Sequence, residues 1–248
     1  MDQYQGKTAV ILGGTSGIGL ATAKMLVERG ARVLVTGRSQ AGLESTRAEL
    51  GESALVVSSD AGSLKDIDAL AERAKDAFGA LDLLFLNAGA AHFAPFEQTT
   101  EAVYDEMFDV NTKGSFFTVQ KLAPLINRGG AVVFTTAISN AKGMPMLAAA
   151  GATKAATRSF VRTFAAELLP QGIRVNAVSP GPIDTPNWGK AFPDKDVAAQ
   201  LTGQLSDANP MKRLGASEEV AKAVLFLAFD ATYTTGAEIP VDGGQSQL

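Results

Sequence analysis

Short apolar runs alternate with longer amphipathic stretches along the whole chain. The apolar runs have the length of buried strands and lie at 8–12, 32–36, 54–58, 81–86, 131–136, 174–179 and 238–241. Helical stretches, with apolar residues three or four positions apart, lie at 18–26, 40–50, 63–78, within 99–125, at 148–169 and at 218–229. This alternation predicts an α/β fold, a doubly wound parallel sheet of about seven strands with helices on both faces.

Length, composition and charge narrow the class of protein. The 248 residues are 46% hydrophobic and show no repeat or linker, so residues 1–248 are predicted to form a single domain. Acidic residues outnumber basic ones by 26 to 22, which argues against nucleic acid or an anionic membrane as partner. With no cysteine and one histidine, no metal site is expected. Without an apolar signal core or a run of about 18 apolar residues, we expect a soluble cytoplasmic protein.

The first strand, loop and helix carry the strongest binding signal. Glycines stand at 13, 14, 17 and 19, between an apolar run and a helical stretch. Glycine lets the backbone approach a ligand closely, and the free N–H groups and positive dipole end of a helix attract phosphate. In this context the loop predicts that a dinucleotide binds here and that the fold is of the Rossmann type.

The residues that directly follow the first six apolar runs are mostly small, polar or glycine, with Arg38 and Asp60 among them. In a parallel sheet, ligands bind beyond the carboxyl ends of the strands. Any one such end is ordinary turn chemistry, but six together predict a cofactor groove. They are 13–19, 37–39, 60–61, 87–89, 137–140 and 180–182.

A set of motifs is spread over essentially the whole chain. The motifs are GGTSGIG at 13–19, the strand end at Asp60, NAG at 87–89, FDVNTKG with Asn111, ATKAA with Lys154, RVNAVSPGPIDTP at 174–186 and VDGG at 241–244. Together they resemble the short-chain dehydrogenase/reductase family. Leu12 departs from the family, which usually has Thr there, and this costs a hydrogen bond but not the glycine geometry. The resemblance implies hydride transfer between a nicotinamide cofactor and a small carbonyl or alcohol substrate. It also implies a homotetramer, for which the apolar surfaces of 113–125 and 151–169 and the apolar last strand are the sequence support.

The resemblance also implies which residues bind the cofactor. They are Gly13, Thr15, Ser16, Gly17, Ile18, Gly19, Arg38, Ser39, Asp60, Ala61, Asn87, Ala88, Gly89, Lys154, Pro180, Gly181, Ile183 and Thr185. The second strand ends in Gly37-Arg38 without a carboxylate for a ribose hydroxyl, which favours NADP(H) over NAD(H). Arg38 is suited to bind a 2′-phosphate bidentately, with Ser39 adding a bond; the alternative is a solvated arginine at a strand end.

The catalytic motif is incomplete. In the family, a Tyr hydroxyl passes the proton, a Ser hydroxyl orients the substrate oxygen, a Lys four residues after the Tyr binds the ribose and lowers the Tyr pKa, and an Asn supports a proton path. A free phenol has a pKa of about 10, so the nearby ammonium is needed. Here Lys154 and Asn111 are present, but Ala150 stands at the Tyr position and Ala137 at the Ser position.

Two explanations of these alanines remain open. Both proton-handling hydroxyls are missing while the flanking residues match active relatives, which favours an engineered site; natural loss would give a cofactor-binding pseudoenzyme. No tyrosine elsewhere is followed four residues later by lysine. His92 is a possible replacement acid because imidazole exchanges protons near neutral pH, and Thr136 and Ser139 are possible hydroxyl donors. The plainer interpretation of these three is an exposed loop histidine and two structural caps.

Between Pro180 and Pro210 the chain is predicted to be irregular, with prolines at 182, 186 and 193. Its position after the sixth strand suggests a substrate loop over about 182–210, although a plain surface loop is the alternative. Trp188 and Phe192, with Phe93, Met144 and Met146 expected nearby, favour an apolar or aryl substrate.

Overall fold

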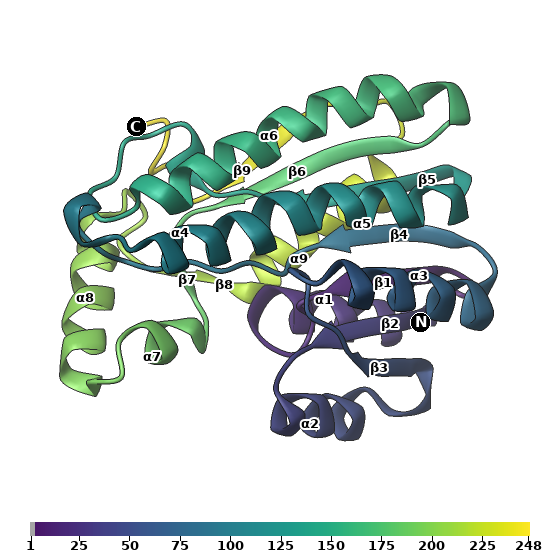
Figure 1. Ribbon diagram of the computed structural model, residues 1–248, viewed down its shortest axis with the longest axis horizontal. Coiled ribbons are helices and arrows are strands. Elements are labelled where there is room, and N and C mark those ends of the chain that lie inside the picture. Colours follow the sequence, from purple (N-terminus) through teal and green to yellow (C-terminus); the bar gives the residue numbers. More distant parts are fainter. Residues whose placement is uncertain (1–2) are drawn as a thin grey trace.

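Seven parallel strands form the central sheet of the computed structural model, which describes residues 3–248 (Figure 1). Their order is β3-β2-β1-β4-β5-β6-β9, and every neighbouring pair is parallel. The strands are β1 Thr8–Leu12, β2 Arg32–Gly37, β3 Ala54–Ser58, β4 Leu81–Leu86, β5 Ile126–Thr135, β6 Arg174–Pro180 and β9 Glu238–Val241. The predicted fold class is confirmed, and each of the seven apolar runs forms a strand.

Helices cover both faces of this sheet, and two further helices lie apart from it at one end of the molecule (Figure 1). They are α1 Gly17–Val27, α2 Gln40–Leu50, α3 Leu64–Phe78, α4 Glu101–Phe108, α5 Ser115–Leu122, α6 Ala148–Leu168, α7 Asn187–Ala191, α8 Lys195–Ala208 and α9 Ser217–Leu225. One buried cluster packs α1, α2 and α9 on the sheet through residues such as Leu26 and Val220. A second packs α3, α5 and α6 on the other face through residues such as Leu122 and Val161. Figure 1 shows α4, α5 and α6 in front of the strands.

The predicted irregular segment before Pro210 is mostly helical, so that prediction is wrong. Helices α7 and α8 stand apart from the sheet layers at one end of the molecule (Figure 1). Pro186 and Pro193 precede the two helices, where a missing N–H costs little. Asp194 caps α8 by accepting hydrogen bonds from the backbone N–H groups of Asp196 (2.9 Å) and Val197 (3.3 Å).

Two further features complete the fold. A π-helical turn, Asp109–Gly114, joins α4 to α5, and two short strands, β7 Ile183–Asp184 and β8 Gly215–Ala216, pair with each other. No helix within residues 3–248 has both the length and the apolar character needed to cross a membrane.

Candidate functional site

The carboxyl ends of β1 and β4 meet at the point where the strand order reverses. From β1 the chain builds outward through β2 to β3, and it then returns to the other side of β1 as β4. Such a reversal leaves a crevice beyond the strand ends, because the connecting segments turn to opposite sides. The glycine loop and the NAG segment at 87–89 both lie at this crevice.

The backbone of the glycine loop is held in a shape that only glycine fits. Gly13 has φ +67°, and a Cβ added there would lie 2.7 Å from Cα of Ala88. A Cβ at Gly19 would overlap the carbonyl oxygen of Gly13. Ser16 precedes α1 in extended conformation without capping it through its side chain. The first N–H groups of α1 therefore face the crevice without a side-chain acceptor, which suits an anion.

Asn87 ties this loop to the neighbouring strands. Its Nδ2 donates to the carbonyl oxygen of Gly13 at 2.9 Å, and its Oδ1 accepts from the Thr135 hydroxyl at 3.2 Å. On the opposite wall, Thr185 meets the start of α1, because a Cβ added at Gly17 would lie 3.1 Å from Thr185 Cγ2. The structure thus brings together predicted residues from the first, fourth and sixth strand ends.

Arg38 and Asp60 lie at the outer end of the groove, after β2 and β3. Arg38 Nη1 is 4.0 Å from Asp60 Oδ2, and their side chains are 61% and 45% exposed. An exposed pair at this distance contributes little stability, so the guanidinium remains open to a ligand. The Ser39 hydroxyl accepts from the backbone N–H of Gly42 at 3.4 Å and caps α2. It therefore has a structural role in addition to any contact with phosphate.

Lys154 and Asn111 meet near Gly89 at the inner end of the groove. A Cβ added at Gly89 would lie 3.3 Å from Asn111 Oδ1 and 3.5 Å from Lys154 Nζ. Lys154 Nζ donates to the carbonyl oxygen of Thr135 at 2.9 Å, and burial lowers the pKa of Lys154 to about 8. Burial disfavours the charged form because the ammonium loses water. The pKa of Lys154 thus lies closer to neutral pH than that of a solvated lysine.

Three hydrogen bonds fix the Asn111 side chain. Its Oδ1 accepts from the N–H of Ala90 at 2.8 Å, and its Nδ2 donates to the Ala90 carbonyl oxygen at 2.8 Å and to the Thr153 hydroxyl at 2.9 Å. The sequence does not identify two of these partners, Thr153 and Thr135. Thr135 contacts both Lys154, through its carbonyl oxygen, and Asn87, through its hydroxyl. The one signal for Thr153 is that it directly precedes Lys154 in the ATKAA motif.

Neither alanine of the incomplete motif distorts its surroundings. Ala150 is buried in the first turn of α6, one helical turn before Lys154. Ala137 follows β5 in extended conformation, with φ −166° and ψ 157°. Alanine suits both places, since it is the best helix former and has no polar group to satisfy. The backbone therefore keeps a regular conformation at both positions.

His92 lies on the rim of the groove, on the loop after β4. Its Nε2 is 2.9 Å from Glu106 Oε2 on α4, and its side chain is 43% exposed. This placement agrees with the plainer interpretation of an exposed loop histidine.

Ser139 is half-buried beside α6, where its carbonyl oxygen closely approaches Gly151. Within residues 3–248, no group of three His, Cys, Asp or Glu side chains is placed to bind a metal ion.

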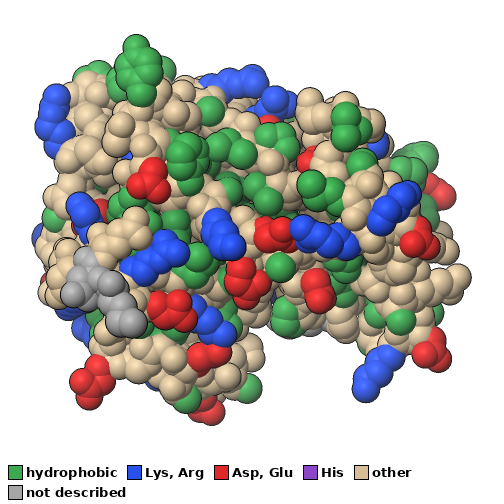
Figure 2. Space-filling view, turned by 180° about the vertical axis from the view of Figure 1, so that it is seen from behind, with side chains coloured by type: hydrophobic (Ala, Val, Ile, Leu, Met, Phe, Trp, Pro, Cys, Tyr) green, Lys and Arg blue, Asp and Glu red, His purple; other side chains and the backbone are tan. Residues whose placement is uncertain are grey.

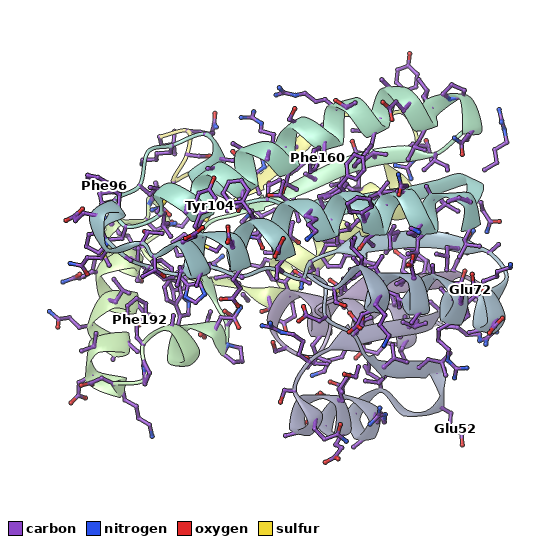
Figure 3. The ribbon with its side chains drawn as sticks, viewed as in Figure 1. Glu52, Glu72, Phe96, Tyr104, Phe160 and Phe192 are labelled. Atoms are coloured by element: carbon purple, nitrogen blue, oxygen red, sulfur yellow. The ribbon has the colours of Figure 1, made fainter. Side chains whose placement is uncertain are left out.

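Three aromatic side chains gather where α7 approaches the loop after β4. The ring centroid of Phe93 is 6.0 Å from that of Trp188 and 5.4 Å from that of Phe192. Trp188 Nε1 donates to the carbonyl oxygen of Ile183 at 2.7 Å, which anchors the indole. Figure 3 shows Phe192 beside α7, at the same end of the molecule as Phe96. The backbone N–H of Ala94 donates to the Met146 carbonyl oxygen at 3.1 Å, which adds the 144–146 segment to this wall.

Comparisons with known proteins agree with this geometry. A family model described as enoyl-(acyl carrier protein) reductase matches residues 13–246. Oxidoreductase asL5 of Sarocladium schorii is 39% identical, with 100% of this chain and 99% of that protein covered. L-rhamnose 1-dehydrogenase (NAD(P)(+)) of Azotobacter vinelandii is 35% identical, with 96% of each chain covered.

The structure of levodione reductase has a TM-score of 0.89 at 31% identity, covering 98% of this chain and 99% of that one. A structure of a short chain dehydrogenase/reductase family protein has a TM-score of 0.88 at 38% identity and covers both chains fully. The chain belongs to the short-chain dehydrogenase/reductase family of oxidoreductases.

Proposed function

We propose that this chain is an NADP(H)-dependent oxidoreductase scaffold for interconverting ketones or aldehydes and alcohols, with its chemistry impaired at two positions. The family generally binds NAD(P)(H), and its members act on small molecules. The single observation that carries the proposal is the arrangement around α6. There hydrogen bonds hold Lys154 and Asn111, the two residues that the family resemblance assigns to the active site, while Ala137 and Ala150 supply no hydroxyl.

The groove fits a dinucleotide. A bound nicotinamide dinucleotide supplies the hydride donor or acceptor of the reaction. The glycine loop and the first N–H groups of α1 would hold its diphosphate, and the exposed Arg38 guanidinium would bind a 2′-phosphate. Lys154 would hold the nicotinamide ribose, as the family resemblance implies.

The missing hydroxyls decide how fast this chain works. Without a phenol at 150, the substrate oxygen lacks the side-chain acid that the family resemblance implies, a loss on the order of 10²- to 10⁴-fold. Without a hydroxyl at 137, the oxygen loses an orienting donor, for which roughly 10²- to 10³-fold is a comparable case. Because the two groups act together, the losses do not multiply fully.

An apolar or aryl substrate is the class that the aromatic wall supports. Trp188 and Phe192 lie on the segment 182–210, which we take as the lid over the substrate, and their rings contact that of Phe93 on the loop after β4. Aromatic side chains bury large areas and stack on rings with specific geometry. A ketone beside an aromatic ring is therefore the first substrate to try.

A homotetramer with twofold axes completes the proposal. β9 is the last strand of the sheet and leaves one edge unpaired within residues 3–248. Leu169, Phe226 and Tyr233 are large exposed hydrophobic residues. Figure 2 shows hydrophobic side chains gathered on the upper part of the face seen from behind. Such surfaces call for a partner, and a monomer by light scattering at micromolar concentration would contradict this assembly.

The test of the proposed function is NADPH consumption with a panel of aryl ketones. We expect very slow turnover by the chain as it stands and a rise of several orders of magnitude in the Ala137→Ser/Ala150→Tyr double variant. Brisk turnover by the unchanged chain would require another acid, His92 first. A double variant that binds NADPH but stays silent would favour the alternative, a pseudoenzyme that binds NADP(H) and acts through assembly or sensing.

A further inference from the structure

One carboxylate joins three elements behind the groove. Glu238 lies on β9, and its side chain is only 12% exposed. Its Oε1 accepts hydrogen bonds, each 2.5 Å long, from the Thr136 hydroxyl and from Asn140 Nδ2. Its Oε2 lies 2.9 Å from Arg158 Nε on α6. The segment after β5, the helix α6 and the edge strand β9 therefore meet at this one side chain.

The Thr136 hydroxyl has one hydrogen and two acceptors within reach. It lies 3.0 Å from the Val178 carbonyl oxygen, but that oxygen already accepts from the backbone N–H of Thr136 at 2.9 Å. A bond to an ionised acceptor is roughly twice as strong as a neutral one. The hydrogen therefore goes to Glu238, and the carboxylate holds this segment firmly.

The contacts of Glu238 surround position 137. Thr136 and Asn140 lie on either side of Ala137 in the chain, and Ala137 itself is extended. Successive side chains of an extended segment point to opposite faces, so Glu238 pulls on Thr136 from the face opposite to Ala137. On α6, Arg158 is one helical turn beyond Lys154, on the same side of the helix.

We infer that Glu238 is a positioning residue that fixes the distance between position 137 and the helix that carries positions 150 and 154. The inference rests on the proposed function, because the placement of residue 137 affects chemistry only where a hydroxyl there orients the substrate oxygen. The role differs from simple stabilisation. A positioning role requires that a substitution at Glu238 change the local structure at positions 137 and 150 more than it changes the structure of the core.

The two alanines provide a direct readout in the chain as it stands. With 13C-methyl-alanine labelling, Glu238→Leu should shift or broaden the NMR signals of Ala137 and Ala150 while core residues such as Ala9 keep theirs. Glu238→Gln, which keeps an acceptor oxygen for Thr136 and Asn140, should largely restore the Ala137 signal. Unchanged signals at both sites, or equal changes throughout the core, would overturn the inference.

Two substitutions on α6 form a test variant and its matched control, and they still test the inference if Glu238→Leu fails to fold. Arg158→Met removes only the ion pair and should move the Ala150 signal, whereas Arg162→Met, at an exposed position one turn further along α6, should not. Thr136→Val removes the hydrogen bond from the Thr136 hydroxyl to Glu238 and should shift the NMR signal of Ala137. If neither Arg158→Met nor Thr136→Val changes these signals, Glu238 does not position the site.

Kinetics give the second readout. In the Ala137→Ser/Ala150→Tyr background, Glu238→Leu should lower kcat roughly 10- to 100-fold, the scale of a misplacement of about 1 Å, with KM for NADPH unchanged. An unchanged kcat would count against the inference while leaving the proposed function intact. A silent background would count against the proposed function, and the methyl signals would still decide the role of Glu238.

Discussion

The two ends of the groove differ in what their function requires of the sequence. Around the glycine loop, the binding features are backbone features: N–H groups at the start of α1 and a close approach between Gly13 and Ala88. Around α6, the proposed proton chemistry depends on two side-chain hydroxyls, and both positions hold alanine. Alanine keeps the helix and the strand end intact. The proposed function therefore implies that the two alanines impair proton transfer but leave nucleotide binding in place.

The largest expected effect is at the α6 end. Ala150→Tyr alone should raise the rate of NADPH-dependent ketone reduction on the order of 10²- to 10⁴-fold, because the phenol would lie one turn from the Lys154 ammonium. Consumption of NADPH measures it. Ala152→Tyr, at an exposed position on the same helix, is the control and should change nothing. An equal gain from both variants would mean that a general effect, and not acid catalysis at 150, is responsible.

The sequence predicted the sheet and the strand-end residues because both depend on local pattern. Apolar runs define buried strands, and glycines at 13 and 19 mark a backbone that other residues cannot follow. Helices α7 and α8 were missed because prolines around a short amphipathic segment resemble an irregular loop. The contact of Arg158 with Glu238 was not predictable, since it joins residues 80 positions apart in the sequence and depends on where the fold places α6 and β9.

Lys154 should make stability depend on pH. Burial lowers its pKa from 10.5 to about 8. Between these values the unfolded chain binds a proton that the folded chain has released, so this residue makes stability rise as pH increases from about 8 to 10.5. The gain should be about 1 to 3 kcal/mol.

Urea unfolding across this pH range tests the rise. Other lysines and tyrosines also titrate there, so the quantity to compare is the difference between the chain and Lys154→Met. In that variant the rise should be smaller by the stated amount. Parallel curves for the two proteins would show that the ammonium is not desolvated in the groove.

Arg38 tests, at the nucleotide end of the groove, whether the chain prefers NADPH to NADH. Arg38→Ala should weaken NADPH binding by about 1.5 to 3 kcal/mol, because a charge-assisted contact to the 2′-phosphate is lost. NADH binding should change little. Calorimetric titration measures both, with the exposed Arg73→Ala as control. Equal losses for the two nucleotides would remove the basis for preferring NADP(H).

Ser39 gives the smallest effect, and it tests whether one hydroxyl serves both the fold and the ligand. Its Oγ accepts from the Gly42 N–H at the start of α2. Ser39→Ala should lower the free energy of unfolding by about 1 kcal/mol through the lost cap. Ser39→Asp keeps a capping oxygen, so stability should stay near that of the unchanged chain.

The aspartate variant separates the two roles because its charge lies beside the Arg38 guanidinium. A carboxylate there repels a 2′-phosphate and is able to accept a hydrogen bond from a free ribose hydroxyl. Ser39→Asp should therefore weaken NADPH binding and leave NADH binding equal or tighter, while thermal unfolding is unchanged. If NADPH affinity is unaffected by both variants, Ser39 serves only as the cap of α2. The 2′-phosphate contact would then rest on Arg38 alone.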